Sequence, residues 1–274
     1  MNPSGAGGGL VARAGILLIF LAYAAPLLLI VLASFKTDFQ IVNDPAAIVF
    51  HPTFEAYRAV FTGQFVQGVA NSLVIAGGAT LLTLAVGVPL TYVLARAYSV
   101  WGGVVIGVLI VLQMTPEATS VIPQFKILSL LGLLGTRFGV ILAMSAAVLP
   151  YGILILRPFV LSVPVEVEEA AQIDGAGRLR TFALIVFPLM RNGVSLLAVL
   201  LFIGEWGDFL YPLSYLNDQT QFPLSVLLLE QQGYYGTQWN NLMALAILGA
   251  IPTIVIFTLV ARRLTSGLAL GVGK

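Results

Sequence analysis

The feature that most constrains this chain is a succession of apolar runs long enough to cross a lipid bilayer. A spanning helix needs about 20 predominantly apolar residues. Only 9% of the residues are charged and 59% are hydrophobic, whereas soluble proteins carry about 25% charged residues, so lipid must cover much of the surface. We therefore predict an all-α integral membrane protein with six transmembrane helices, in segments 14–34, 71–95, 102–114, 138–159, 192–210 and 242–260.

The third of these runs is the shortest, and apolar character returns after it at residues 121–134. A helix of this length is too short to span a typical bilayer unless it is extended. The outer end of the third span is therefore left open by the sequence.

The distribution of lysine and arginine orients the chain, because cytoplasmic loops carry the excess of these residues. With the N-terminus in the cytoplasm, nine cations fall inside and four outside. This predicts cytoplasmic N- and C-terminal tails at residues 1–13 and 261–274, and one membrane domain at 14–260 with a cytoplasmic loop at 161–188. The inner cations are Arg13, Arg96, Arg157, Arg178, Arg180, Arg191, Arg262, Arg263 and Lys274, and the outer ones are Lys36, Arg58, Lys126 and Arg137.

Composition excludes several kinds of chemistry. The chain has no cysteine and a single histidine, His51, and its net charge is +1, so we expect no thiolate metal site, no catalytic residue and no nucleic-acid partner. Gly273-Lys274 lacks the rest of a P-loop, and Gly175-Ala176-Gly177 lacks the third glycine of a dinucleotide motif. We therefore expect no cofactor and no metal in this chain, and any ATP that drives it must bind another polypeptide.

Two other kinds of protein are alternatives. A transporter working alone would place paired ionisable residues within its spans, but these spans are nearly free of charge. An intramembrane enzyme would need a nucleophile with a base, or metal ligands, within the spans. Neither alternative is favoured by the residues present.

A polar segment from Pro164 to Pro188 interrupts the apolar pattern. Its residues P-V-E-V-E-E-A-A-Q-I-D-G predict a short helix with acidic residues in its first turns, where the helix dipole favours them, and Gly175 as the left-handed residue after its end. A second helix is expected from Arg178 to Pro188. Ala170, Ala171 and Asp174 are spaced to share one face. An acidic helix would be repelled by anionic lipid, so this pattern favours docking to a protein.

The segment from Glu169 to Gly175, with Ile185 and Pro188, resembles the signature loop of ABC importer permeases: E-A-A, three residues, G, nine residues, then I-x-L-P. Phe187 stands in place of the leucine. The longer form E-E-A-A-x-I-D-G-A resembles the carbohydrate-uptake branch. Residues 50–53 with Tyr57, and residues 206–213, resemble other parts of these permeases. Residues 239–245, Pro252 and residues 267–271 resemble the ending of the maltose-type second permease subunit.

This resemblance implies an ABC type I importer permease fold and a prokaryotic cell membrane as the location. It implies four kinds of partner: a second homologous permease, two ABC ATPase subunits that bind ATP and magnesium, an extracytoplasmic sugar-binding lipoprotein and a carbohydrate substrate. It also implies a coupling helix that docks on the ATPase. The expected docking residues are Glu168, Glu169, Ala170, Ala171, Asp174, Gly175, Arg178 and Pro188.

Two further groups of residues are candidates for contact with solute or binding protein. Acids near a membrane span are functional suspects, and sugars bind through polar and aromatic side chains. The expected substrate path comprises Gln113, Glu117, Glu205, Trp206, Asp208, Tyr211 and Asn217. The expected contact with a binding protein comprises Gly233, Tyr234, Tyr235 and Gly236. The alternatives are acids solvated at the membrane surface and an aromatic belt at the headgroups.

Overall fold

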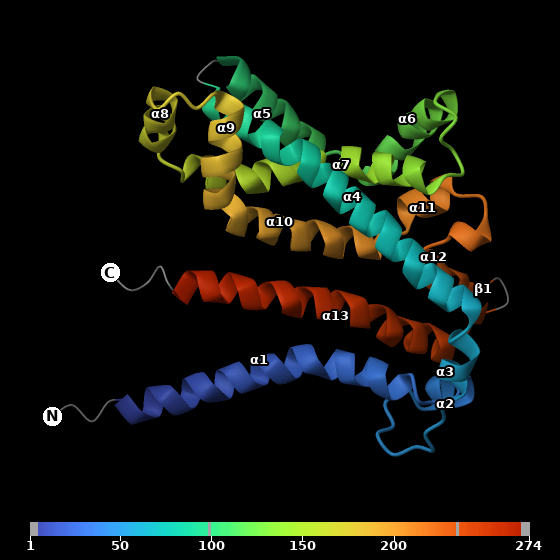
Figure 1. Cartoon of the computed structure of the whole chain (residues 1–274). Helices are drawn as coiled ribbons and strands as arrows, with labels where there is room; N and C mark the ends of the chain where they lie inside the picture. Colours follow the sequence, from blue (N-terminus) through green and yellow to red (C-terminus); the bar gives the residue numbers. More distant parts are fainter. Residues whose placement is uncertain (1–4, 98–99, 234–235, 270–274) are drawn as a thin grey trace. The chain divides into compact units, whose positions relative to one another are not determined.

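The computed structural model describes residues 5–97, 100–233 and 236–269, which are almost entirely helical (Figure 1). They fall into two compact units: unit 1 takes in residues 5–65 and 228–251, and unit 2 takes in residues 66–227 and 252–269. The prediction of an all-helical membrane protein is confirmed, apart from one short hairpin formed by β1 (Gln232–Gly233) and β2 (Gly236–Thr237).

Unit 1 contains α1 (Gly5–Ala33), α2 (Asp38–Asn43), α3 (Glu55–Val60), the hairpin and the first part of α13 (Trp239–Ala269). Its loops are fixed by polar contacts. The Ser34 hydroxyl lies 2.8 Å from the Tyr57 hydroxyl, and the buried Lys36 ammonium donates to the carbonyl of Pro45 at 3.0 Å. The Asp38 carboxylate accepts the Asn240 N–H at the start of α13.

Unit 2 contains the helices that position the candidate sites. In chain order these are most of α4 (Gly63–Arg96), α5 (Val100–Gln113), α6 (Glu117–Leu130), α7 (Arg137–Leu161), α8 (Val165–Ile173), α9 (Arg178–Thr181), α10 (Phe187–Gly207), α11 (Leu210–Tyr215) and α12 (Leu224–Glu230). A π-helical turn, η1 (Phe182–Val186), joins α9 to α10, and a 3₁₀ turn, η2 (Gln219–Gln221), follows α11.

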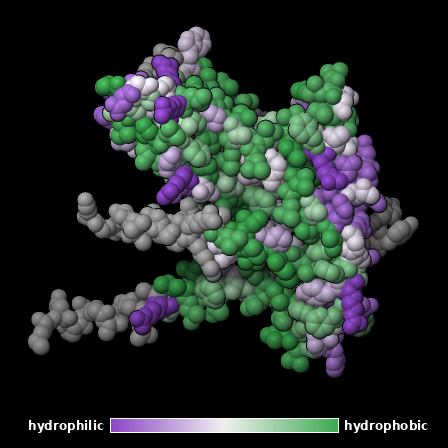
Figure 2. Space-filling view, in the orientation of Figure 1, coloured by the Kyte–Doolittle hydropathy of each residue, from purple (hydrophilic) through white to green (hydrophobic). Residues whose placement is uncertain are grey.

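The core of unit 2 consists of two apolar clusters along α4 and α7. One cluster joins these helices to α6 and α11 through residues such as Ile75, Met144 and Tyr215, and the other joins them to α10 through Val88, Leu156 and Met190. In Figure 1, α8 and α9 lie at one end of the unit and α6 and α11 at the other. Hydrophilic residues gather around both ends, with hydrophobic residues between them (Figure 2).

Among the described residues, five helical segments are long and apolar enough to span a membrane: 13–33, 63–96, 137–161, 178–207 and 239–259. The predicted third span corresponds to α5 and α6, which meet at 104° and pass the same test only as a pair. Pro116 explains the break, because proline has no N–H to continue α5 and it stands just before α6. Counted as one broken span, the pair brings the candidate spans among the described residues to the six predicted.

The fifth span differs from the prediction at both ends. The helix expected to stop at Pro188 instead continues through it, from Arg178 to Gly207. The π turn accommodates the proline, since Phe187 N–H bonds to Phe182 O, five residues back, and Pro188 then occupies the first turn of α10. The span ends at Gly207, before Asp208.

Candidate functional site: a docking helix and an acidic pocket

The α8 helix ends in the glycine turn that the sequence predicts. Gly175 has φ +86, a conformation that costs glycine little. Its N–H donates to Gln172 O at 3.0 Å, and Ala176 N–H donates to Ala171 O at 2.9 Å. These two bonds form a Schellman motif, which satisfies carbonyls at the helix end and fixes the direction of the chain into α9.

The inner face of α8 is fixed to the end of α4 by a buried ion pair. Glu168 is 4% exposed. Its Oε1 accepts from Arg96 Nη2 at 2.5 Å and Nε at 2.8 Å, and its Oε2 accepts from the Tyr92 hydroxyl at 2.8 Å. Arg96 Nη2 also donates to Val163 O at 2.8 Å. We call Tyr92, Arg96 and Glu168 the α4–α8 clamp.

This clamp corrects the role expected for two residues. Glu168 and Ala171 were predicted to face a docking partner, but both are buried within unit 2. Residues three apart share a helix face, so Glu168 and Ala171 turn inward together. Glu169, Ala170 and Asp174 lie on the exposed side. A contact of these exposed residues with an ATPase stays a prediction.

Other residues around α8 were not singled out from the sequence. Ile173 is 86% exposed and Leu179 is 80% exposed, so two apolar side chains accompany the acids on the outer surface. Arg178, Leu179 and Glu169 also line a cavity of about 660 Å³ between α8, α9 and the end of α4. Predicted docking residues Gly175, Arg178 and Pro188 are all exposed.

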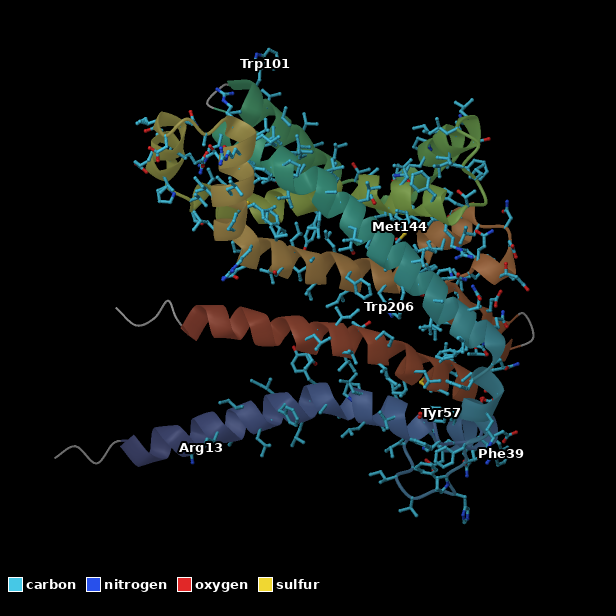
Figure 3. The ribbon with its side chains drawn as sticks, in the orientation of Figure 1. Arg13, Phe39, Tyr57, Trp101, Met144 and Trp206 are labelled. Carbon is cyan, nitrogen blue, oxygen red and sulfur yellow. The ribbon has the colours of Figure 1, made fainter. Side chains whose placement is uncertain are left out.

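A second cavity, of about 530 Å³, lies where α10 ends, at the opposite end of unit 2 from α8. We call it the acidic pocket, because the side chains of Glu117, Glu205 and Asp208 line it. In Figure 3, Met144 on α7 and Trp206 on α10 mark this region. The remaining wall is formed by Met144, Ala147, Val148, Tyr151, Leu200, Leu201, Gly204, Gly207, Phe209, Leu210 and Tyr211.

The carboxyl groups of the pocket differ in their surroundings. Asp208 Oδ1 accepts the Leu210 N–H at 2.7 Å, yet burial raises the pKa of Asp208 to about 6, and the nearby Glu117 charge adds to the rise. Glu205 is 8% exposed. Burial also raises the pKa of the Tyr211 hydroxyl, which lies 3.1 Å from the Ser120 hydroxyl.

The pocket brings together four of the seven residues predicted for the substrate path. Glu117, Glu205, Asp208 and Tyr211 line it, from three helices and the turn between two of them. The other three do not line it. Gln113 and Asn217 are exposed, and Trp206 is buried and stacks on Phe202 with ring centroids 5.5 Å apart. A role for any of the seven in transport stays a prediction.

Two of the four residues expected to contact a binding protein, Gly233 and Gly236, lie in the hairpin of unit 1. Gly233 pairs with Gly236, whose φ of +133 favours glycine. Tyr234 and Tyr235 lie outside the described residues.

The family described as "Binding-protein-dependent transport system inner membrane component" matches residues 83–269. The chain is 31% identical to the melibiose/raffinose/stachyose import permease protein MelC of Bacillus subtilis, over 84% of this chain and 83% of that protein. It is 29% identical to the diacetylchitobiose uptake system permease protein NgcG of Streptomyces coelicolor, over 90% of this chain and 82% of that protein.

A solved structure supports the same fold. A chain of a bacterial ABC transporter involved in the import of the acidic polysaccharide alginate superposes with a TM-score of 0.77 at 21% identity, covering 96% of this chain and 98% of that one. The resemblance to type I importer permeases is therefore confirmed at the level of fold.

Proposed function

Because this chain belongs to the family of binding-protein-dependent transport system inner membrane components, we propose that it is the permease subunit of an ABC importer for a di- or oligosaccharide. The observation that carries this proposal is α8, an exposed acidic helix with a fixed glycine turn and a buried attachment to α4. The sugars named for the relatives from Bacillus subtilis and Streptomyces coelicolor support a carbohydrate as the solute.

The proposed assembly adds four polypeptides to this chain. A second homologous permease completes the pore, two ABC ATPase subunits bind beneath α8, and an extracytoplasmic sugar-binding lipoprotein delivers the solute. The chain itself is not an enzyme and holds no cofactor, since ATP and magnesium bind the ATPase subunits. The complex lies in the cell membrane of a prokaryote.

The clamp suggests how movement at α8 reaches the spans. When the ATPase subunits close on ATP, a docked α8 moves with them. The buried ion pair fastens α8 to α4, and the helix from Arg178 to Gly207 leaves the glycine turn without a break. Two spans are thus attached to the docking helix, as required for alternating access driven by rigid-body motion.

Co-purification in mild detergent tests the proposal. Tagged wild-type permease is expected to recover an ATPase and a second permease. The variant Glu169→Lys, Gly175→Pro is expected to recover the second permease alone, since it reverses a charge on the exposed face of α8 and forces Gly175 away from φ +86. Glu230→Lys reverses an exposed acid on α12 and serves as the control.

The outcomes separate the proposal from its alternative. Loss of the ATPase from the α8 variant but not from Glu230→Lys supports docking through α8. If the wild-type chain purifies alone and moves solute without ATP, the chain is a transporter that works by itself and the importer proposal is wrong.

A further inference from the structure

The acidic pocket contains a buried carboxyl group with no cation among the residues that line it. Glu205 lies in the last turns of α10, lines the pocket and is 8% exposed. Among the described residues, no lysine, arginine or histidine forms an ion pair with it. An ionisable group in a spanning helix is costly unless it has a partner, and such a residue generally marks a solute or ion path.

Two further acidic side chains line the same pocket. Asp208 and Glu117 line it from two other segments, and the residues lining it include no lysine, arginine or histidine. An ionised carboxylate can only accept hydrogen bonds. The wall therefore has no cation to balance an anionic solute, and its carboxylates offer acceptors for hydroxyl or ammonium groups.

The apolar part of the wall suits a sugar ring. Tyr151 and Tyr211 line the pocket together with aliphatic residues, and aromatic faces pack well against the C–H faces of sugars. A volume of about 530 Å³ falls in the range of about 300–1,000 Å³ that small-molecule sites occupy. Among the described residues, no group of three or more acids is arranged to hold a metal ion, so an organic solute fits the acids better than a shared cation.

We propose that the acidic pocket is a solute-binding subsite of the permease that takes a sugar unit through its hydrogen-bond donors, prefers an amine-bearing sugar and excludes an anionic one. This proposal rests on the proposed function and adds the class of solute to it. A carboxylate with an ammonium partner makes a stronger bond than one with a hydroxyl, whereas a sugar carboxylate would meet three acids and no cation.

A charge series of disaccharides tests the preference. Chitobiose, cellobiose and cellobiuronic acid share a β-1,4-linked pyranose skeleton and differ in charge. Binding of each to the purified importer complex, without its binding protein, is measured by calorimetry near neutral pH. We expect chitobiose to bind about tenfold more tightly than cellobiose, the gain of one charged hydrogen bond, and cellobiuronic acid to show no binding.

Two variants connect this binding to the pocket. Glu205→Gln keeps the shape and removes the carboxyl group that would bind an ammonium, so it is expected to remove most of the advantage of chitobiose over cellobiose. Gly204→Val is expected to abolish binding of chitobiose and cellobiose, because its side chain projects into open space on the pocket wall. Gly107→Val is the matched control, since Gly107 also has open space around it but lies on α5, outside the pocket.

The other outcomes overturn the pocket proposal, and uptake by the wild type shows whether the proposed function fails with it. Equal binding of the three sugars, or binding that Gly204→Val leaves unchanged, would show that the pocket does not select the solute. If Glu205→Gln complexes lose the second permease, the Glu205 carboxyl group pairs with a basic residue of that partner and not with a solute. In both cases ATP-driven sugar uptake by the wild type would leave the proposed function intact. If the wild type takes up none of the sugars with ATP, the proposed function itself is wrong.

Discussion

Two adjacent glutamates on α8 have opposite environments. Glu168 is buried against Arg96 and Tyr92, whereas Glu169 is exposed. One residue of offset on an α-helix turns the side chain by about 100°, so neighbours with the same chemistry serve different roles. Glu168 positions the helix, and Glu169 is available to a partner.

Removing Glu168 should weaken the attachment of α8. Glu168→Ala leaves the largely buried Arg96 guanidinium without a carboxylate, and loss of one partner of a buried pair costs about 3–5 kcal/mol. Tyr92→Phe removes one hydrogen bond and keeps the ring against Phe182, so it should cost about 1 kcal/mol. Thermal unfolding of the purified permease measures both effects.

Glu166→Ala is the control for this prediction, because Glu166 is exposed on the same helix and surface substitutions usually change stability by less than about 0.5 kcal/mol. If Glu168→Ala unfolds at the same temperature as Glu166→Ala, the ion pair does not stabilise the attachment of α8.

Asp208 should make stability depend on pH. Because burial raises its pKa to about 6 in the folded protein, above the value of about 3.9 expected in the unfolded chain, the unfolded state releases its proton first as pH rises. The folded state is therefore favoured most below pH 4 and loses this advantage up to about pH 6. Asp208→Asn should consequently gain stability relative to wild type between pH 4 and 7.5, on the order of 1–2 kcal/mol.

The matched control is Asp218→Asn. Asp218 is exposed, and the Thr220 N–H holds its pKa below the ordinary range. The stabilising effect of its charge is present above the unfolded pKa and is lost as pH falls, so its variant should not gain stability with rising pH. Parallel unfolding curves for wild type and Asp208→Asn across this range would contradict the prediction.

At the scale of elements, α7 and α10 approach closely at a glycine. A Cβ built on Gly193 would overlap the ring of Phe159. Small residues allow spanning helices to pack closely in membranes, where dispersion contacts and not water drive association. The contact also adjoins the cluster that includes Met190 and Leu197, so Gly193 is a packing residue and its position on α10 determines the distance to α7.

Gly193→Ala should therefore destabilise the permease by about 1–3 kcal/mol, the usual effect of overpacking a core. Phe159→Leu in the same chain should recover part of this loss by making room for the methyl group. Thermal unfolding in detergent compares these variants with Gly77→Ala, whose position on α4 has no neighbour near the new Cβ. Equal melting temperatures for Gly193→Ala and Gly77→Ala would exclude a close packing role.

At the scale of the molecule, α8 and the acidic pocket lie at opposite ends of unit 2 (Figure 1). The span from Arg178 to Gly207 connects the two regions directly, since it begins at the glycine turn and ends beside Glu205 and Asp208. This arrangement puts the proposed ATPase contact and the proposed solute contact at opposite ends of one candidate span.

Cysteine labelling tests this topology, and the chain has no native cysteine to interfere. Glu166→Cys on α8 and Asp218→Cys before η2 are both exposed. A membrane-impermeant maleimide should label Asp218→Cys in intact cells and Glu166→Cys only after the membrane is permeabilised. Labelling of both positions in intact cells would place them on the same side and contradict six spans.

The class of protein, the candidate spans and the helix that ends at Gly175 could all be predicted from the sequence, because these depend on local properties. Apolar run length predicts a spanning helix, and a glycine after an acidic helix predicts the turn at Gly175. The loop signature placed the chain among importer permeases, which the family match confirms.

The tertiary structure alone decided which side chains meet. Arg96 and Glu168 are 72 positions apart, and the pocket joins Glu117, Tyr151 and Glu205 from three helices. The break at Pro116 and the inward turn of Ala171 likewise depend on how the helices pack. Periodicity fixes which residues share a face of one helix, but nothing local in the chain specifies which face of another helix lies against it.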